Sequence, residues 1–224
     1  MKELVVAISH VADGNMYIPT DKENKAVVSN RQTFLNTVGI GLNQTSRVDI
    51  HYEGTNYRRY REVSLHERGK GMTIDNIESA DALITRNLNH ALFLPLADCV
   101  GTVIFDSQQK ILMLSHVGRH SLEQDGAYAS VKYLIDTYQS DPHQLKVWLT
   151  AAPVQQSYPL WAFDNRDFKE VVLEQLHRAG TLDENIINDR SDSSKDKRFF
   201  SHSEFLAGRR STDGRYAIVA MMTS

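Results

Sequence analysis

The stretch LADCVGTVIFDSQQKILMLSHVGRH, residues 96–120, decides the fold of this chain. It contains two apolar runs, VGTVIFD (100–106) and KILMLSHVG (110–118), which a polar turn separates. Short runs that are apolar at successive positions are typical of strands covered on both faces. We therefore expect two strands buried between layers. The stretch also holds the chain's only cysteine, Cys99, and a histidine, His116, at the end of the second run.

Helices and further strands are expected on both sides of this pair. Apolar side chains recur at helical spacing in residues 27–41, 121–139 and 165–180. Further strand candidates are the apolar or alternating runs at residues 46–54, 80–96, 145–153 and 214–222. The sequence shows no internal repeat and no linker. One domain of mixed α/β type over residues 1–224 accounts for the whole pattern.

Two of the expected helices begin with a capping-box pattern. Ser29 and Gln32 predict the start of the first helix, and Ser121 and Gln124 predict the start of the second. The second start follows directly after the opening stretch. An exposed helix N-terminus favours phosphate or another anion, and Arg119 is a nearby charge partner.

The composition indicates an ordinary soluble protein. The 224 residues carry a net charge of -3 and are 41% hydrophobic, which gives no electrostatic reason to bind nucleic acid or an anionic membrane. A single cysteine cannot form an internal disulfide, as suits a reducing cytoplasm. The apolar run at residues 4–8 is too short for a signal peptide, and no run is long enough for a membrane span. We expect a cytoplasmic protein. The basic segment 58–71 is expected to be a solvated strand and loop.

Cys99 and His116 leave three interpretations open from residue types alone. A thiolate and an imidazole are ligands that zinc favours. The same two side chains could form a nucleophilic pair in a metal-free hydrolase. A lone cysteine in a strand region is also commonly a small buried hydrophobe. Their spacing does not choose between these interpretations.

The opening stretch resembles the signature of the YfiH-like, or laccase-domain, family, which runs ADC-x-P, an apolar strand and turn, and then H-A-G-W-R-G before a helix. Three other segments agree with family patterns. SNRQTFLNTVGI (29–40) resembles the N-R helix, SADALIT (79–85) resembles A-D-A-L-x-T, and RFFSHSEFLAGRRSTDGRYAIVAMM (198–222) resembles F-F-S-x-R followed by G-R and a last strand. The resemblance implies an α+β fold, a single-domain layered sandwich of mixed β-sheet flanked by helices.

The resemblance also implies a metal site and a reaction. In the family, the cysteine, this histidine and an earlier histidine from a Q-V-H-G segment hold a metal, usually zinc. Members cleave adenosine, inosine or methylthioadenosine with phosphate to release the base and ribose 1-phosphate, and adenosine deamination is also attributed to them. The older family name reflects copper-dependent oxidation of phenols, so copper is the second candidate metal. One cysteine and no His-x-His motif argue against a multicopper oxidase.

The chain departs from the family pattern at several positions. Gly101 stands in place of the proline of ADC-x-P, Arg119 in place of the tryptophan of H-A-G-W-R-G, and His120 in place of its arginine. The arginine of F-F-S-x-R is missing, since Ser203 or Glu204 stands near its place. His202 is a polar substitute there. AISHVADGN (7–15) replaces the N-terminal F-x-T-R segment.

The third metal ligand has more than one candidate. His51 in VDIHYEG follows the N-R helix, as the Q-V-H-G histidine does, and is the preferred ligand. His66 in SLHERGKG is closer in spacing to SADALIT. If Tyr52 holds the histidine's place, the third ligand is missing.

The resulting hypothesis is a purine nucleoside phosphorylase that needs a small-molecule nucleoside and phosphate. Its metal ligands would be His51, Cys99 and His116. Asp98 would be an acid or base beside Cys99 and His116. Phosphate or ribose would bind to Arg119, His120, Ser121 and His202. Two alternatives remain: a non-catalytic family member that binds a nucleoside or a protein, and a metal-free Cys/His hydrolase.

Overall fold

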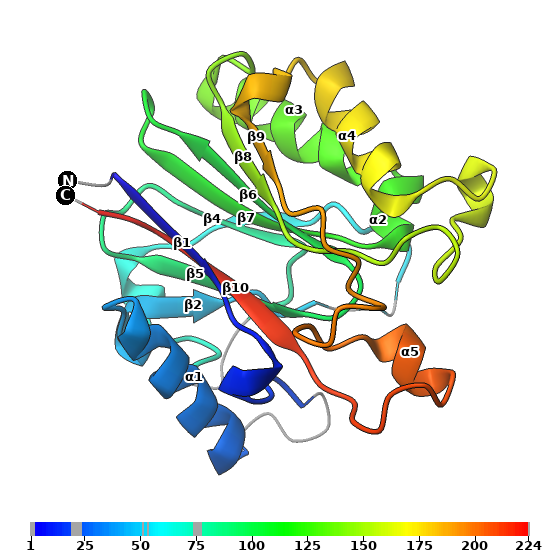
Figure 1. Ribbon diagram of the computed structural model, residues 1–224. Helices are drawn as coiled ribbons and strands as arrows, with labels where there is room; N and C mark the ends of the chain where they lie inside the picture. The colour runs from blue at the N-terminus through cyan, green and yellow to red at the C-terminus, as the bar shows by residue number, and fades with distance from the viewer. Residues whose placement is uncertain (1–2, 19–23, 51, 53, 74–77, 224) are drawn as a thin grey trace.

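Two facing β-sheets with helices on their outer sides make up the fold (Figure 1). The computed structural model describes residues 3–18, 24–50, 52, 54–73 and 78–223. Within these ranges the strands form a four-stranded and a six-stranded sheet, each with parallel and antiparallel pairs. This arrangement confirms the expected α+β fold with mixed sheets flanked by helices.

The smaller sheet has the strand order β1-β10-β5-β2. Its strands are β1 (Leu4–Ile8), β2 (Thr45–Arg47), β5 (Ala91–Leu96) and β10 (Tyr216–Met222). Strand β10 is antiparallel to both of its neighbours, β1 and β5, and β2 runs parallel to β5. The first and last strands of the chain therefore lie side by side (Figure 1).

The larger sheet has the strand order β3-β4-β7-β6-β8-β9. Its strands are β3 (Tyr60–Glu62), β4 (Ala82–Thr85), β6 (Val100–Asp106), β7 (Ile111–Val117), β8 (Lys146–Leu149) and β9 (Ile186–Asn188). The two outermost pairs are parallel and the inner pairs are antiparallel. The two apolar runs of the opening stretch form the central hairpin β6–β7, as predicted, and both strands are buried along their whole length.

Alternate residues of the central strands face two different apolar layers. In β7, Leu112 and Leu114 pack between the sheets, while Ile111 and Met113 pack under the helices of the larger sheet. Side chains alternate between the two faces of a strand, so both faces of β7 are covered. The same alternation places His116 on the inter-sheet face, two residues beyond Leu114.

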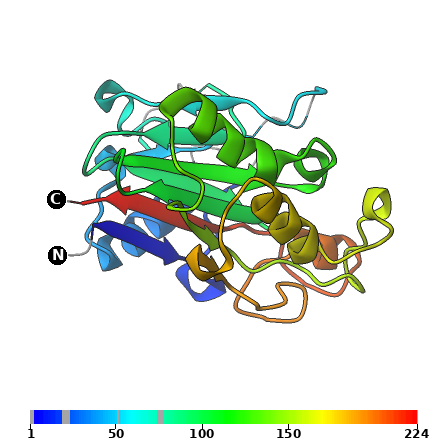
Figure 2. The ribbon, with the colours of Figure 1, turned by 90° about the horizontal axis from the view of Figure 1, so that it is seen from above.

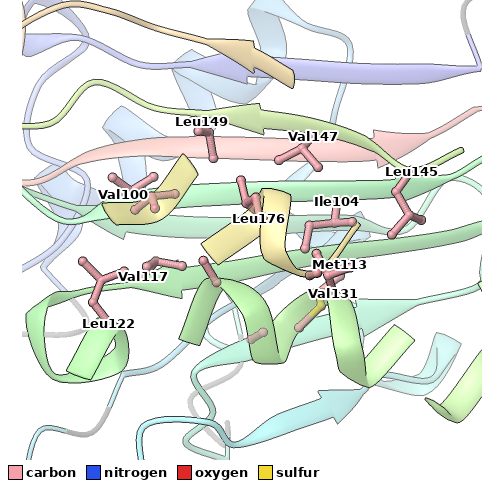
Figure 3. Packing of buried hydrophobic residues seen from close by; sticks show 14 of the residues in the cluster. Val100, Ile104, Met113, Val117, Leu122, Val131, Leu145, Val147, Leu149 and Leu176 are labelled. Carbon is pink, nitrogen blue, oxygen red and sulfur yellow. The ribbon is translucent and has the colours of Figure 1, made fainter. Parts of the chain in front are cut away.

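In the part of the chain that the structure describes, three long helices cover the outer faces of the sheets. They are α1 (Lys25–Thr37), α3 (Gly126–Tyr138) and α4 (Phe168–Arg178). Helix α1 packs on the smaller sheet (Figure 1), whereas α3 and α4 lie over the larger sheet (Figure 2). Figure 3 shows side chains of both helices, such as Val131 and Leu176, meeting Ile104 and Met113 of the hairpin. No helix among the described residues combines the length and the apolarity that crossing a bilayer requires.

The remaining helical segments are short. They are α2 (Arg119–Glu123), α5 (His202–Leu206), and the 3-10 turns η1 (Val11–Asp13), η2 (Leu42–Gln44), η3 (Leu65–Glu67), η4 (Trp161–Phe163) and η5 (Asp183–Asn185).

Both predicted capping boxes are wrong. Helix α1 begins four residues before Ser29, because the Asn24 side chain accepts hydrogen bonds from the first backbone N–H groups. Ser121 lies inside α2, whose N-cap is Gly118. The predicted helix 121–139 is in fact divided between α2 and α3, because Asp125 adopts a left-handed conformation with φ of 59°.

Two predicted strands also differ from the structure. Among the described residues of 46–54, only 46 and 47 belong to a strand, because the chain leaves the sheet after Val48 donates its N–H to the Phe93 carbonyl. Tyr52, which lies within this predicted strand, is 65% exposed. Residues 80–96 form two strands, β4 and β5, which belong to different sheets.

A buried histidine between β4 and β5 gives the fold a pH dependence. His90 is fully buried, and its Nε2 lies 2.8 Å from Ser46 Oγ. Burial lowers the pKa of His90 to about 4, so the folded protein holds a neutral imidazole.

We predict that lowering the pH from 7.5 to 5 destabilises the protein through His90. The unfolded chain binds a proton below its ordinary pKa of about 6.5, whereas the folded chain does not until about pH 4. The free energy of unfolding should therefore fall by on the order of 2 kcal/mol through this group. Urea unfolding at both pH values measures this free energy, and its change between pH 7.5 and pH 5 should be smaller for His90→Asn than for the wild type. The exposed-site variant His66→Asn should behave like the wild type, and an unchanged pH difference in His90→Asn would contradict the assignment.

Candidate functional site

Cys99 lies in the tight turn that carries the chain from the smaller sheet to the larger one. The turn connects the end of β5 to the start of β6, and the Cys99 N–H donates to the Ala97 carbonyl at 2.9 Å. Asp98, in the middle of the turn, has φ of 70°, a conformation that aspartate tolerates better than most residues. Cys99 therefore sits at the junction of the two sheets, close to where α2 begins.

Cys99 and His116 converge on Gly118. A Cβ at Gly118 would lie 3.2 Å from Cys99 Sγ, 2.9 Å from His116 Cε1 and 3.5 Å from His116 Nε2. The thiol and the imidazole nitrogen therefore border the same point. A side chain at position 118 would displace one of them, which explains the need for glycine here. The structure thus brings the two strongest candidate residues of the sequence together.

Burial keeps both groups of this pair uncharged. It lowers the pKa of His116 to about 4, so the imidazole is neutral at neutral pH. Burial raises the pKa of the Cys99 thiol to about 12, and the charge of Asp98 acts in the same direction. The positive charges of Arg215 and Arg119 act in the opposite direction. A thiolate at this position therefore needs a further cation, which a metal ion would supply.

The third metal ligand is not assigned by the described residues. His51 lies outside them. His66 is exposed in η3, and the neighbouring Glu67 carbonyl accepts a hydrogen bond from Ser46 in β2. Ser46 pairs with Leu92, near the start of β5, whereas Cys99 follows the end of that strand. No three His, Cys, Asp or Glu side chains of the described ranges are grouped to hold a metal. Tyr52 contacts the site instead, its ring edge-on to His116 with centroids 6.2 Å apart.

Asp98 binds the start of α5. One carboxylate oxygen accepts from Ser201 Oγ at 2.6 Å, and the other accepts from the Ser203 N–H at 2.7 Å. The segment FFSHS therefore closes over the residue before Cys99. Both oxygens of Asp98 are used in this way, which indicates a positioning role for a residue that the sequence suggested as an acid or base.

His202 is the first residue of α5 and faces Asp213. Its Nδ1 is 3.0 Å from Asp213 Oδ1, and the same oxygen accepts from Arg215 Nη1 at 2.8 Å. Arg215 precedes β10, whose first residue, Tyr216, pairs with Leu96. This register puts Arg215 beside the turn that holds Cys99.

The predicted anion-binding residues at the start of α2 have different surroundings. His120 turns away toward the surface, where its ring stacks on the Tyr57 ring with centroids 5.1 Å apart. Its Nδ1 lies 3.2 Å from Glu123 Oε2. Ser121 is buried, with its Oγ only 1.9 Å from the position of a Cβ on Gly126. Arg119 is the one whose charge acts on Cys99. Because α2 has only five residues, the expected helix N-terminal anion site rests on Arg119 alone.

Sequence reasoning missed two residues of this site. Arg215 belongs to the G-R pattern before the last strand, so the motif was visible but its proximity to Cys99 was not. Tyr158 comes from the loop after β8, and burial, with Cys99 beside it, raises the pKa of its phenol to about 12. Nothing in its local sequence signals this position.

Gly101, which replaces the family's proline, fits its position in two ways. Its N–H donates to Thr150 Oγ1 at 2.9 Å, a bond that proline cannot make. A Cβ there would lie 2.9 Å from Ile218 Cγ2, inside the layer between the sheets. Both the hydrogen bond and the packing therefore explain a glycine at this position.

The two facing mixed sheets, with a cysteine and a histidine at their junction, define a protein of YfiH-like fold. Residues 6–223 match the sequence model of the family described as multi-copper polyphenol oxidoreductase laccase, and the chain belongs to this family.

Solved structures agree with this assignment. The chain is similar to the hypothetical protein YfiH of Bacillus licheniformis, with 20% identity over 93% of this chain and 85% of the other, and a TM-score of 0.81. It is also similar to YlmD from Geobacillus stearothermophilus, with 20% identity, coverage of 99% and 93%, and a TM-score of 0.81. At this identity the likeness shows the fold alone. A search of the curated proteins gave no match.

We predict that Asp98→Ala destabilises the protein by about 2–4 kcal/mol, because it leaves Ser201 and Ser203 without their charged acceptor. Asp98→Asn should lose less stability, since the amide keeps one acceptor oxygen and asparagine tolerates the positive φ. Urea unfolding measures both. Asp106→Ala is the matched control: it removes a buried carboxylate that accepts two backbone N–H groups in the β6–β7 turn.

Labelling of Cys99 by a thiol reagent should accelerate in Asp98→Ala and not in Asp106→Ala. Equal labelling rates would show that Asp98 does not hold the Cys99 turn.

Proposed function

We propose that the chain is a zinc-dependent purine nucleoside phosphorylase, which converts adenosine, inosine or methylthioadenosine and phosphate to the free base and ribose 1-phosphate. The observation that carries the proposal is the convergence of Cys99 Sγ and His116 Nε2 on Gly118. Adenosine deamination is a second reaction proposed for the same site. Both are activities that the family resemblance implies.

The donor set favours zinc. A cysteine sulfur with a neutral imidazole suits zinc, which accepts mixed sulfur and nitrogen ligands and keeps an open position in catalytic sites. His51 is the proposed third ligand, and copper is the second candidate metal. When bound, the metal would act as a Lewis acid that polarises an oxygen of water or substrate.

The charged residues around Cys99 suit an anionic second substrate. Arg119 and Arg215 come from different elements, and the positive charge of each acts on the Cys99 thiol. Such fixed positive charge attracts phosphate and stabilises the charge that it carries in the reaction. These two arginines are proposed to take the place of the arginines that the family has in H-A-G-W-R-G and F-F-S-x-R.

A non-catalytic role is the second candidate, and one observation favours it. His120, which stands in place of a family arginine, is engaged by Tyr57 and Glu123 at the surface. A site that lost this arginine could bind a nucleoside without cleaving it. The metal-free hydrolase is not supported, because a thiol with a pKa of about 12 beside a neutral imidazole is a poor nucleophile.

We predict that purified wild-type protein retains about one zinc per chain after dialysis. Cys99→Ala and His116→Ala should lose it, because each removes a donor atom. Zinc is measured by inductively coupled plasma mass spectrometry, with His66→Ala as the control that keeps its metal. Loss in His51→Ala would assign the third ligand. Full zinc in both Cys99→Ala and His116→Ala would contradict the site.

We also predict that the zinc-loaded wild type releases adenine from adenosine only when phosphate is present. Chromatography should find ribose 1-phosphate in an amount equal to the adenine. Cys99→Ala should lose the activity, whereas His66→Ala should keep it. Binding of adenosine by calorimetry without any product would instead support the non-catalytic role. Formation of inosine without adenine would identify deamination as the reaction.

A further inference from the structure

The His202 and Asp213 side chains form an oriented acid-base pair. His202 Nδ1 lies 3.0 Å from Asp213 Oδ1. An ionised carboxylate can only accept a hydrogen bond, so Nδ1 carries a proton and Nε2 remains for another partner. An imidazole that a carboxylate orients in this way is suited to transfer a proton through its second nitrogen.

Two sets of hydrogen bonds attach this pair to the Cys99 turn. Ser201 and Ser203, on either side of His202, both bind the carboxylate of Asp98, at 2.6 Å and 2.7 Å. His202 therefore lies between the two residues that bind Asp98, the residue next to Cys99. This anchoring fixes the backbone of His202 against the site. The side chain is 41% exposed, so a substrate can reach its ring.

Asp213 also connects His202 to the charges near Cys99. The oxygen that binds His202 accepts from Arg215 Nη1 at 2.8 Å, and the charge of Arg215 acts on the Cys99 thiol. One carboxylate therefore orients the imidazole and a proposed phosphate-binding arginine together. The pair is therefore connected to two segments that border Cys99.

We propose that His202, oriented by Asp213, is the general acid that protonates the leaving purine base; this inference rests on the proposed phosphorylase function. A phosphate oxygen forms a bond to C1′ of the ribose as the bond from C1′ to N9 of the base breaks. The electron pair of the broken bond stays with the base. The imidazolium gives its Nε2 proton to N7, so the base leaves neutral, and His202 regains a proton from water afterwards.

The test compares His202→Gln and Asp213→Asn with a matched control, His177→Gln. The control histidine lies in the last turn of α4 and is 40% exposed, and its Nε2 lies 2.7 Å from Asp183 Oδ1 in η5, so the variant loses a similar surface pair. Phosphorolysis is measured with adenosine and with 4-nitrophenyl ribofuranoside, whose leaving group needs no proton. Zinc per chain is measured for each variant.

His202→Gln should lower kcat for adenosine by about 100-fold or more, as expected for the loss of a general acid. Its KM, its zinc content and its rate with the nitrophenyl riboside should stay near wild-type values. Asp213→Asn should lose more activity with adenosine than with the nitrophenyl riboside, but it should lose some with both, because Asp213 also holds the proposed phosphate-binding Arg215. His177→Gln should match the wild type. Equal losses on both substrates, or no loss on adenosine, would overturn the role of His202 while leaving the phosphorylase function intact. No adenine release by the wild type would overturn both.

Discussion

The packing of the two sheets against each other is the constraint on which the rest of the structure depends. Leucines of β5 and β7 fill the layer between the sheets, and alternate residues of the same strands are covered by helices on the outside. Burial of apolar surface on both faces is the main favourable contribution to such a fold. It also excludes polar side chains from the length of these strands, so chemistry is confined to the ends where the chain passes between sheets.

The turn at Asp98 and Cys99 is such an end, and its polar groups form one connected set. Asp98 binds the serines around His202, and Asp213 binds both His202 and Arg215. These partners lie more than a hundred residues after Asp98 in the sequence. Buried or half-buried polar groups are costly unless they are paired, so each of these contacts supports the geometry of the others.

The sequence predicted the parts of the fold that local periodicity determines. The hairpin β6–β7, the last strand and helix α4 follow from apolar spacing that has no competing interpretation. The starts of α1 and α2 were wrong, because several residues near each start can cap a helix and tertiary contacts select among them. The site was predicted in part: Cys99 and His116 do meet, while Ser121 is buried against α3 and His120 faces the surface.

By itself, the sequence determined the class of fold and the family, because the motifs that identify them lie in several segments along the chain. It also predicted Cys99 and His116 as site residues from one continuous stretch, and the structure brings these two together. Only the tertiary structure decided which side chains surround that pair. The alternation of β7 puts His116 on the inter-sheet face, and the pairing of β10 with β5 brings Arg215 to the Cys99 turn. Such contacts depend on the register between strands that are distant in sequence, and local patterns do not encode that register.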